Sequence, residues 1–188
     1  MILVQDNFLP KELFGRLQEY CYESDFQVIT AGDKEFLTIP TPDWIIPQIG
    51  IDNSRIVLSF IRKAHKDFDT ELRVHADNII MGERVDYAVV LYINDSDSVS
   101  KNGTKFWEHT KYGESLPLDI SEEEYNYLIL NDSNDYSKWN GTDLIYARPN
   151  RLLMYNAQNF HSKFPEKIEK GERIVLVAFY KKYESDSL

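Results

Sequence analysis

Four residues of this chain, of types that could do chemistry, stand in an informative order. His75 and Asp77 are two residues apart, His161 lies far downstream, and Arg173 follows it by twelve residues. Two imidazoles and one carboxylate can occupy three neighbouring positions around a divalent metal and leave the others open for reacting groups. An arginine beyond the last of these residues adds a fixed cation. The pattern predicts a metal centre that works on an acidic ligand.

A second His-x-Asp pair, His65 and Asp67, competes with His75 and Asp77 for this role. The apolar positions around His65 follow a helical period, and residues two apart on a helix point to roughly opposite sides. Residues 72–77 instead alternate as a strand does, which projects residues two apart to the same face. We therefore expect only His75 and Asp77 to bind one metal together. A surface pair at a strand end is the alternative.

The other two residues of the pattern belong to the apolar segments near the C-terminus. His161 lies between segments 151–155 and 174–180, so a neighbouring strand can carry it to the same pocket. A plain loop histidine is the alternative, and His109 is the rival third ligand. Arg173 opens an apolar strand, where an unpaired charge is very costly. Its partner is a structural carboxylate or, as we favour, a ligand carboxylate held by the guanidinium fork.

Length and composition fit one soluble domain. A chain of 188 residues, 43% hydrophobic and 28% charged, can bury a sizeable core. The net charge of -10 argues against binding to nucleic acid, which needs clustered basic residues. The single cysteine, Cys21, cannot form an internal disulfide, and we expect it to be a buried thiol. No apolar stretch is long enough for a signal peptide or a membrane span, so we expect a cytoplasmic protein.

The elements that must position these residues divide into helices first and strands after. A short strand over 2–4 leads to a helix capped by Asp6 or Asn7 with Pro10 in its first turn, and a second helix is predicted over 56–68. Strands are predicted over 26–29, 35–39, 85–93, 104–107, 144–147, 151–155 and 174–180. We expect a mainly β sandwich or barrel, with the two N-terminal helices packed on one sheet.

Residues 112–141 form a polar insertion within this pattern. Ser121 followed by Glu124 is the signature of a capping box, so a short helix is expected there. Long insertions in compact domains often line a site. We predict a single domain over residues 1–188, with helical support over about 1–70, a β core over about 70–183 and the insertion over about 112–141.

The ordered motifs resemble those of the iron(II)/2-oxoglutarate-dependent oxygenases, and within them the prolyl-hydroxylase-like branch. The resemblance covers residues 70–180, and the opening Asp-Asn-Phe-Leu-Pro before a helix is also common there. The matching pieces are, in order, His75-Ala76-Asp77, Tyr92-Ile93-Asn94, Gly103-Thr104-Lys105-Phe106, His161 and Arg173. Each piece is short, and their order together is fairly specific.

The resemblance implies a double-stranded β-helix (jelly-roll or cupin-like) core and a set of roles for these residues. His75, Asp77 and His161 would bind Fe(II), with 2-oxoglutarate and O2 at the remaining positions. Arg173 would pair with the distal carboxylate of 2-oxoglutarate, and Tyr92 would donate a hydrogen bond to it. Hydroxylation of a substrate C–H bond, with release of succinate and CO2, is the reaction implied. Asp77 fills the position that halogenating relatives leave empty for halide.

Two departures from the family pattern bear on the cosubstrate and the substrate. Many relatives carry Ser or Thr two residues after the arginine, whereas this chain has Val175, so the cosubstrate needs another hydrogen-bond donor. The substrate stays open between a protein side chain, an amino acid and another small metabolite. By resemblance, the loop 94–103 and the insertion surround the pocket mouth, where Trp107 and Trp139 either stack on a ligand or fill the core.

Two other classes of function remain alternatives. One is a cupin-like metal protein that does not use 2-oxoglutarate, in which Arg173 would pair with a protein carboxylate. The other is a non-catalytic binding module on the same scaffold, without affinity for iron. The complete ligand set argues against the second alternative.

Overall fold

A computed structural model describes residues 1–31, 34–94 and 102–183 of the chain. Most of the loop 94–103, which the resemblance places at the pocket mouth, lies outside the described residues. The elements in chain order are β1 (Ile2–Gln5), α1 (Lys11–Glu23), β2 (Gln27–Ala31), β3 (Lys34–Pro40), η1 (Ile46–Gln48), β4 (Ser54–His65), β5 (Ile79–Ile80), β6 (Glu83–Arg84), β7 (Tyr87–Tyr92), β8 (Gly103–His109), α2 (Glu122–Tyr127), η2 (Leu128–Asp132), η3 (Tyr136–Lys138), β9 (Trp139–Tyr146), β10 (Arg151–Asn156), β11 (His161–Phe164) and β12 (Glu172–Lys182).

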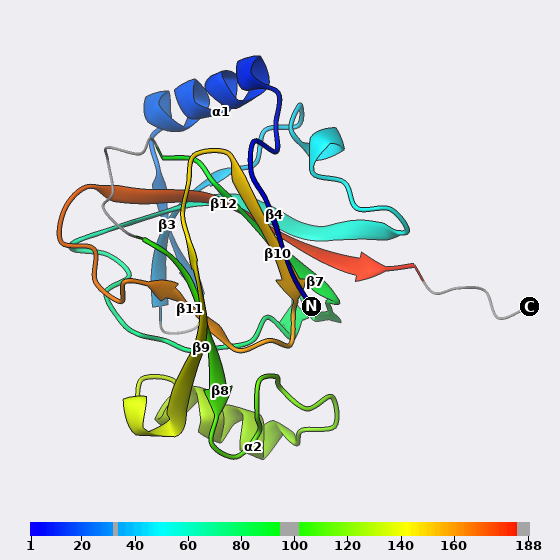
Figure 1. Cartoon of the computed structure of the whole chain (residues 1–188), viewed down its shortest axis with the longest axis vertical. Coiled ribbons are helices and arrows are strands. Elements are labelled where there is room, and N and C mark those ends of the chain that lie inside the picture. Colours follow the sequence, from blue (N-terminus) through cyan, green and yellow to red (C-terminus); the bar gives the residue numbers. More distant parts are fainter. Residues whose placement is uncertain (32–33, 95–101, 184–188) are drawn as a thin grey trace, which may run out of the picture.

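The strands form two main antiparallel sheets (Figure 1). The larger has seven strands in the order β1-β10-β7-β12-β4-β3-β2, and the smaller has three in the order β11-β8-β9. A two-stranded ladder joins β5 to β6. Segments from both ends of the chain interleave in the larger sheet, as the jelly-roll arrangement requires. The predicted mainly β, double-stranded β-helix fold is confirmed.

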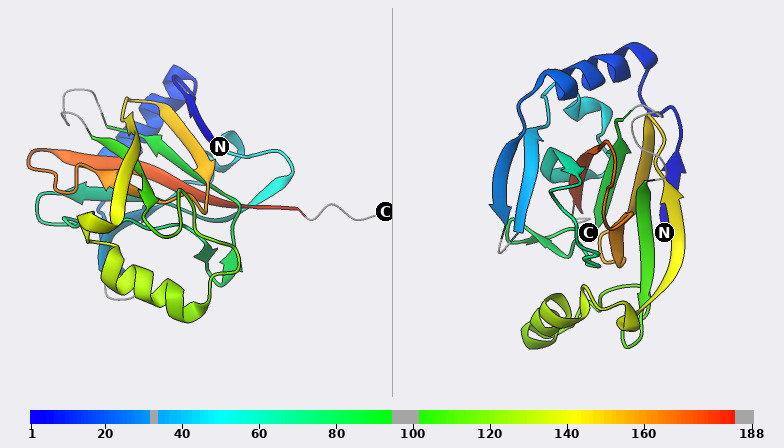
Figure 2. Two further views of the ribbon diagram at one scale, coloured as in Figure 1. Left: turned by 60° about the horizontal axis from the view of Figure 1, so that its bottom comes forward. Right: turned by 90° about the vertical axis from the view of Figure 1, so that its left-hand side faces the viewer.

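The central strands of the larger sheet are buried on both faces. Along β7, Val89 and Leu91 belong to the hydrophobic cluster that includes α1, whereas Ala88 and Val90 belong to the cluster that includes Phe106 of β8. Successive side chains of a strand point to opposite faces, so α1 covers one face and the smaller sheet covers the other. Figure 2 shows α1 and α2 at opposite ends of the molecule. The candidate site lies between the two sheets.

The predicted helix over 56–68 is wrong, because these residues form most of β4. This strand pairs with β12 along its length and with β3 on its other side. Ile61 packs in the cluster under α1, and Phe60 packs against the cluster on the opposite face. A strand that is buried on both faces has no simple alternation, and its apolar residues can mimic the spacing of a helix. Only α1 therefore supports the larger sheet as an N-terminal α-helix, and strands fill much of residues 1–70.

The start of α1 also differs from the prediction. Neither Asp6 nor Asn7 caps it, because the helix begins at Lys11 with Pro10 as N-cap and without a side-chain cap hydrogen bond. Asp6 instead forms an ion pair with Arg151 on β10. Cys21 is fully buried within α1, as predicted, and burial raises the pKa of its thiol to about 12. Among the described residues, no helix combines the length and the apolar character needed to cross a membrane.

The insertion contains the predicted short helix, α2. Ser121 accepts a hydrogen bond from the backbone N–H of Glu124 (3.2 Å), which is the cap bond predicted from the sequence. The carboxylate of Glu124 accepts from the hydroxyl of Ser121 (3.1 Å) rather than from its backbone N–H, as a full capping box would have it. Trp107 and Trp139 are both buried in the hydrophobic cluster beneath the insertion. They fill the core rather than lie open to a ligand.

Candidate metal centre

Backbone pairing sets His75 and His161 opposite each other. His75 lies in an extended segment between β4 and β5, and its N–H and C=O bond those of His161 at 3.0 and 2.9 Å. Two residues later the N–H of Asp77 donates to the carbonyl of Ala157 at 2.7 Å. Because this segment is extended, the side chains of His75 and Asp77 project to the same side, as the alternation of residues 72–77 predicts.

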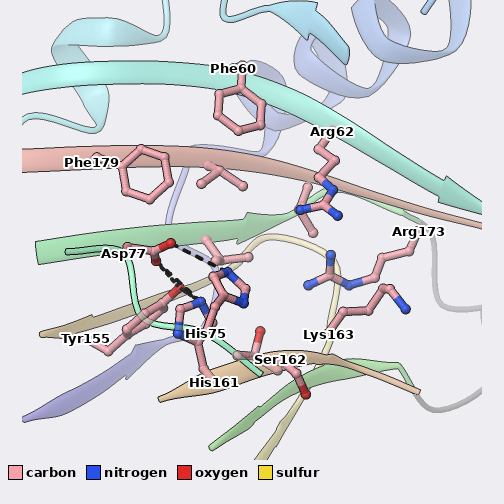
Figure 3. A pocket seen from close by; sticks show the side chains of 14 residues that line it. Phe60, Arg62, His75, Asp77, Tyr155, His161, Ser162, Lys163, Arg173 and Phe179 are labelled. Atoms are coloured by element: carbon pink, nitrogen blue, oxygen red, sulfur yellow. Dashed lines mark hydrogen bonds and ion pairs between the residues drawn. The ribbon is translucent and has the colours of Figure 1, made fainter. Parts of the chain in front are cut away.

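The three side chains converge on one point. One ligand atom from each of His75, Asp77 and His161 lies within 4.8 Å of the others. The carboxylate oxygens of Asp77 lie 3.6 Å from His75 Nε2 and 3.3 Å from His161 Nε2. Figure 3 shows the two imidazoles and the carboxylate facing one another at one end of a pocket. Two nitrogens and one oxygen on one side of a point leave room for further ligands on the other.

Hydrogen bonds to the backbone fix the orientation of both imidazoles. Nδ1–H of His75 donates to the carbonyl of Arg73 at 2.9 Å, and Nδ1–H of His161 donates to the carbonyl of Asn159 at 2.9 Å. The Nε2 atoms therefore carry the lone pairs that a metal needs. Burial is the main cause that lowers the pKa of His75, to about 3, so this imidazole is neutral at pH 7.

Tyr155, on β10, is a residue of this site that the sequence did not reveal. Its hydroxyl lies 3.3 Å from Asp77 Oδ2 and 3.0 Å from His161 Nε2. Burial, followed by the charge on Asp77, raises the pKa of Tyr155, so its phenol stays protonated and can donate. The apolar pattern of residues 151–155 predicted only that Tyr155 belongs to the core.

The pocket has an apolar wall and a cationic end. Phe60, Val90, Val175, Val177 and Phe179 form part of its lining. Arg62, Lys163 and Arg173 lie on the side away from the metal-ligand candidates (Figure 3). An apolar wall between a metal centre and a cationic end suits a small acid that has one end at each.

Arg173 is buried, with 6% of its surface exposed. Its Nη2 approaches the carbonyl of Gly103 at 3.5 Å, and its Nε has no hydrogen-bond partner among the described residues. No carboxylate within the described ranges forms an ion pair with it. Burial is the main cause that lowers the pKa of Arg173. A buried guanidinium without an acid and with a free N–H favours a ligand carboxylate over a structural partner.

Tyr92 lies near Arg173 but does not line the pocket. Its hydroxyl pairs with the hydroxyl of Thr104 at 2.8 Å and approaches the carbonyl of Ile145 at 3.5 Å. Of the two residues, Thr104 belongs to the pocket lining. The predicted hydrogen bond from Tyr92 to a cosubstrate stays a prediction.

The remaining histidines lie outside the cluster. His109 Nε2 lies 3.2 Å from Asp132, and its ring packs against Trp139 with ring centres 4.6 Å apart. His65 ends β4 and lies against Phe68. His65 belongs to a strand and not to a helix, so the helical divergence predicted for His65 and Asp67 is wrong. Within the described residues the metal-ligand group nevertheless contains His75 and Asp77 and not this pair.

Lys163 is the third cation of the pocket, and it was also missed. It stands two residues after His161 on β11 and shares its face. Its ammonium donates to the carbonyls of Pro165 (3.3 Å) and Glu166. Burial lowers the pKa of Lys163 to about 8. The two-residue spacing from His161 was the signal that could have found it.

Comparison with known proteins gives likenesses of structure only. No protein-family model matches the sequence, and no curated protein matches it either. The non-haem α-ketoglutarate-dependent carbocyclase SnoK from nogalamycin biosynthesis aligns with a TM-score of 0.64 and 12% identity, over 96% of this chain and 79% of its own.

Two further solved structures also have a fold similar to that of this chain. HygX from Streptomyces hygroscopicus, with nickel, 2-oxoglutarate and hygromycin B bound, aligns with a TM-score of 0.59 and 12% identity, over 97% of this chain and 82% of its own. A prolyl-4-hydroxylase from Pseudomonas putida aligns with a TM-score of 0.55 and 13% identity, over 97% and 92%. These likenesses confirm the predicted resemblance at the level of the fold.

Proposed function

We propose that this chain is a non-haem Fe(II)- and 2-oxoglutarate-dependent dioxygenase that hydroxylates a C–H bond. The observation that carries the proposal is the placement of His75, Asp77 and His161 within 4.8 Å of one another in a pocket that also contains Arg173. A metal centre alone would suit many metalloproteins. A buried arginine without a protein carboxylate in the same pocket favours a metal centre that uses an acidic cosubstrate.

The donor set fits ferrous iron. Two imidazoles and one carboxylate, with open positions opposite, are typical of non-haem Fe(II) oxygenases. His75, Asp77 and His161 would hold the ion, and the hydrogen bonds at both Nδ1 atoms keep Nε2 directed at it. With 2-oxoglutarate and O2, bound iron supplies the oxidising power to convert C–H to C–OH, with one oxygen atom entering the product and the other entering succinate as CO2 leaves.

Arg173 would bind the distal carboxylate of 2-oxoglutarate. Its free Nε–H and its burial supply a charge-assisted hydrogen bond in a site from which water is largely excluded. The apolar side chains of Phe60, Val177 and Phe179 line the pocket beside it. Tyr155 would donate to Asp77 and so fix which carboxylate oxygen faces the metal.

The predictions about substrate, partners, domain organisation and localisation are kept as part of this proposal. The substrate is a protein or peptide side chain, an amino acid or another small metabolite, and no nucleic acid or membrane partner is expected. The chain is proposed to act as one domain in the cytoplasm. Of the two alternatives, the cupin-like protein loses support because Arg173 has no carboxylate partner among the described residues.

Succinate formation from 2-oxoglutarate without a substrate tests the proposal. With Fe(II) and O2, we expect slow turnover by the wild-type protein and none above background for His161→Ala and Arg173→Ala. His65→Gln, which changes a histidine outside the cluster, should retain wild-type turnover. Wild-type turnover equal to that of His161→Ala would contradict the proposed dioxygenase activity.

A further inference from the structure

Two arginines from neighbouring strands share the cationic end of the pocket. Arg62 on β4 is the direct cross-strand partner of Val175 on β12, and Arg173 lies two residues from Val175. Residues two apart on a strand share a face, and diagonal cross-strand neighbours are within reach of long side chains. Arg62, Val175 and Arg173 all line the pocket, as this register requires. Arg62 therefore stands beside the position that lacks the hydroxyl of many relatives.

The charges of the two arginines are not balanced within the pocket. Asp69 pairs with Arg62 and is itself nearly buried, with 7% of its side chain exposed. No described carboxylate pairs with Arg173, and burial, with a smaller contribution from the charge on Arg62, lowers the pKa of Arg173. Two guanidinium groups close enough to repel each other, of which only Arg62 is paired with a carboxylate, are stabilised by an additional anion.

Both arginines also have an unused donor. The Nε atoms of Arg62 and Arg173 are buried and have no hydrogen-bond partner within the described ranges. Figure 3 shows the two guanidinium groups directed into the same part of the pocket. Lys163 differs, because its ammonium already donates to the carbonyls of Pro165 and Glu166. Two of the three N–H groups of Lys163 are thus already used, whereas each arginine has a buried Nε–H without a partner among the described residues.

The Arg62 side chain is held in place before any ligand arrives. Asp69 binds its Nη2, and its guanidinium lies 4.2 Å from the centre of the Phe36 ring. A cation held over an aromatic face and paired with a carboxylate loses little further freedom when a ligand binds.

We infer that Arg62 is a second specificity-determining residue, which binds the distal carboxylate of the cosubstrate together with Arg173. This inference rests on the proposed function, since it names a residue for the cosubstrate of that same site. Arg62 would supply the hydrogen bond that Val175 cannot, and the pair would select a 2-oxo acid with a second carboxylate over one without.

Direct binding tests this role separately from turnover. Protein loaded with Mn²⁺, which does not start the oxidation, is titrated by calorimetry with 2-oxoglutarate and with 2-oxopentanoate, which has the same length and no distal carboxylate. For Arg62→Met we expect affinity for 2-oxoglutarate to fall roughly 10- to 100-fold, the range for losing a hydrogen bond to a charged group. Affinity for 2-oxopentanoate should change less than threefold.

A matched control and a rescue variant separate this role from a structural one. Arg55→Met removes the same group from the same strand, where Arg55 is paired with Glu83 at the surface, and should leave both affinities unchanged. Adding Val175→Thr to Arg62→Met returns a hydroxyl to the neighbouring position and should recover part of the loss for 2-oxoglutarate alone. Thermal unfolding of each variant shows whether it is folded.

The outcomes distinguish this inference from the proposed function. Wild-type binding of 2-oxoglutarate with unchanged binding by Arg62→Met overturns the role of Arg62 and leaves the proposed function standing. Equal losses for the two acids show that Arg62 only supports the fold, and they also overturn the inference. A wild-type protein that binds Mn²⁺ but not 2-oxoglutarate overturns both.

Discussion

At the residue scale, the three candidate ligands are positioned by backbone pairing rather than by their side chains. The bridge between His75 and His161 uses only N–H and C=O groups, so it survives loss of either imidazole. His161→Ala should therefore remain folded and bind Mn²⁺ or Co²⁺ at least roughly 100-fold more weakly than wild type, since one of three protein ligands is lost. Metal affinity is measured by calorimetry. His65→Gln serves as the control, and equal weakening in both variants would contradict the assignment.

Tyr155 is predicted to tune the metal centre without binding the metal. Tyr155→Phe removes the hydroxyl that lies 3.3 Å from Asp77 while it keeps the ring in the core. Loss of such an outer contact weakens metal binding about tenfold or more. Calorimetry with Mn²⁺ measures the change.

Tyr180→Phe is the matched control for Tyr155→Phe. It deletes another buried hydroxyl, which donates to the carbonyl of Ile49 at 2.6 Å, far from the metal centre. This variant should lose stability and keep wild-type metal affinity. If both variants bind Mn²⁺ as wild type does, the hydroxyl of Tyr155 has no part in the centre.

Residue types that rarely serve only a structural role in such a pattern could be predicted as site residues from the sequence. Residue types that often fill a core could not. A His-x-Asp pair in an extended segment, a distant histidine and a buried arginine can be found by type and spacing. Tyr155 looks like any aromatic core residue, because a phenol among apolar neighbours gives no sign of which acceptor it will meet. Arg62 could not be linked to Val175 until the pairing of β4 with β12 was known.

At the element scale, most strands that carry an apolar run were predicted, and the longest strand was missed. The strands over 35–39, 151–155 and 174–180 correspond to β3, β10 and β12 within a few residues. β4 was read as a helix because both its faces are covered, one by α1 and the other by the pocket and its apolar wall. A strand shows alternating apolar and polar residues when one of its faces is buried and the other is exposed. The two faces of β4 do not differ in this way.

The packing of α1 on the larger sheet gives a prediction about stability. Leu17 is fully buried between the helix and the sheet, so Leu17→Ala leaves a cavity and should lower the free energy of unfolding by about 2–5 kcal/mol. Urea unfolding measures it. Leu3→Ala, at a side chain 41% exposed on the edge strand β1, should change the same quantity by less than about 0.5 kcal/mol. Similar losses for both would mean that α1 is not part of the core.

At the scale of the whole molecule, the order of strands argues for one cooperative unit. β4 and β12 are neighbours although β4 ends at residue 65 and β12 begins at residue 172, and β10 lies between β1 and β7. Neither half of the chain can complete the larger sheet alone. We therefore expect residues 1–188 to unfold in a single transition, in agreement with the predicted single domain.

Because a single unfolding transition is expected, metal binding can be measured as a change in the stability of the whole chain. His75 and Asp77 come from one stretch and His161 from β11, so the site exists only in the folded chain, and a metal that binds it stabilises the whole molecule. At a free Mn²⁺ concentration 100 times its Kd, the gain is about 2.7 kcal/mol, or roughly 5–10 °C in Tm for a domain of this size. Scanning calorimetry with Mn²⁺, and again after a chelator removes it, measures the shift. His161→Ala should show almost none, and a shift of equal size in that variant would place the stabilising ion elsewhere.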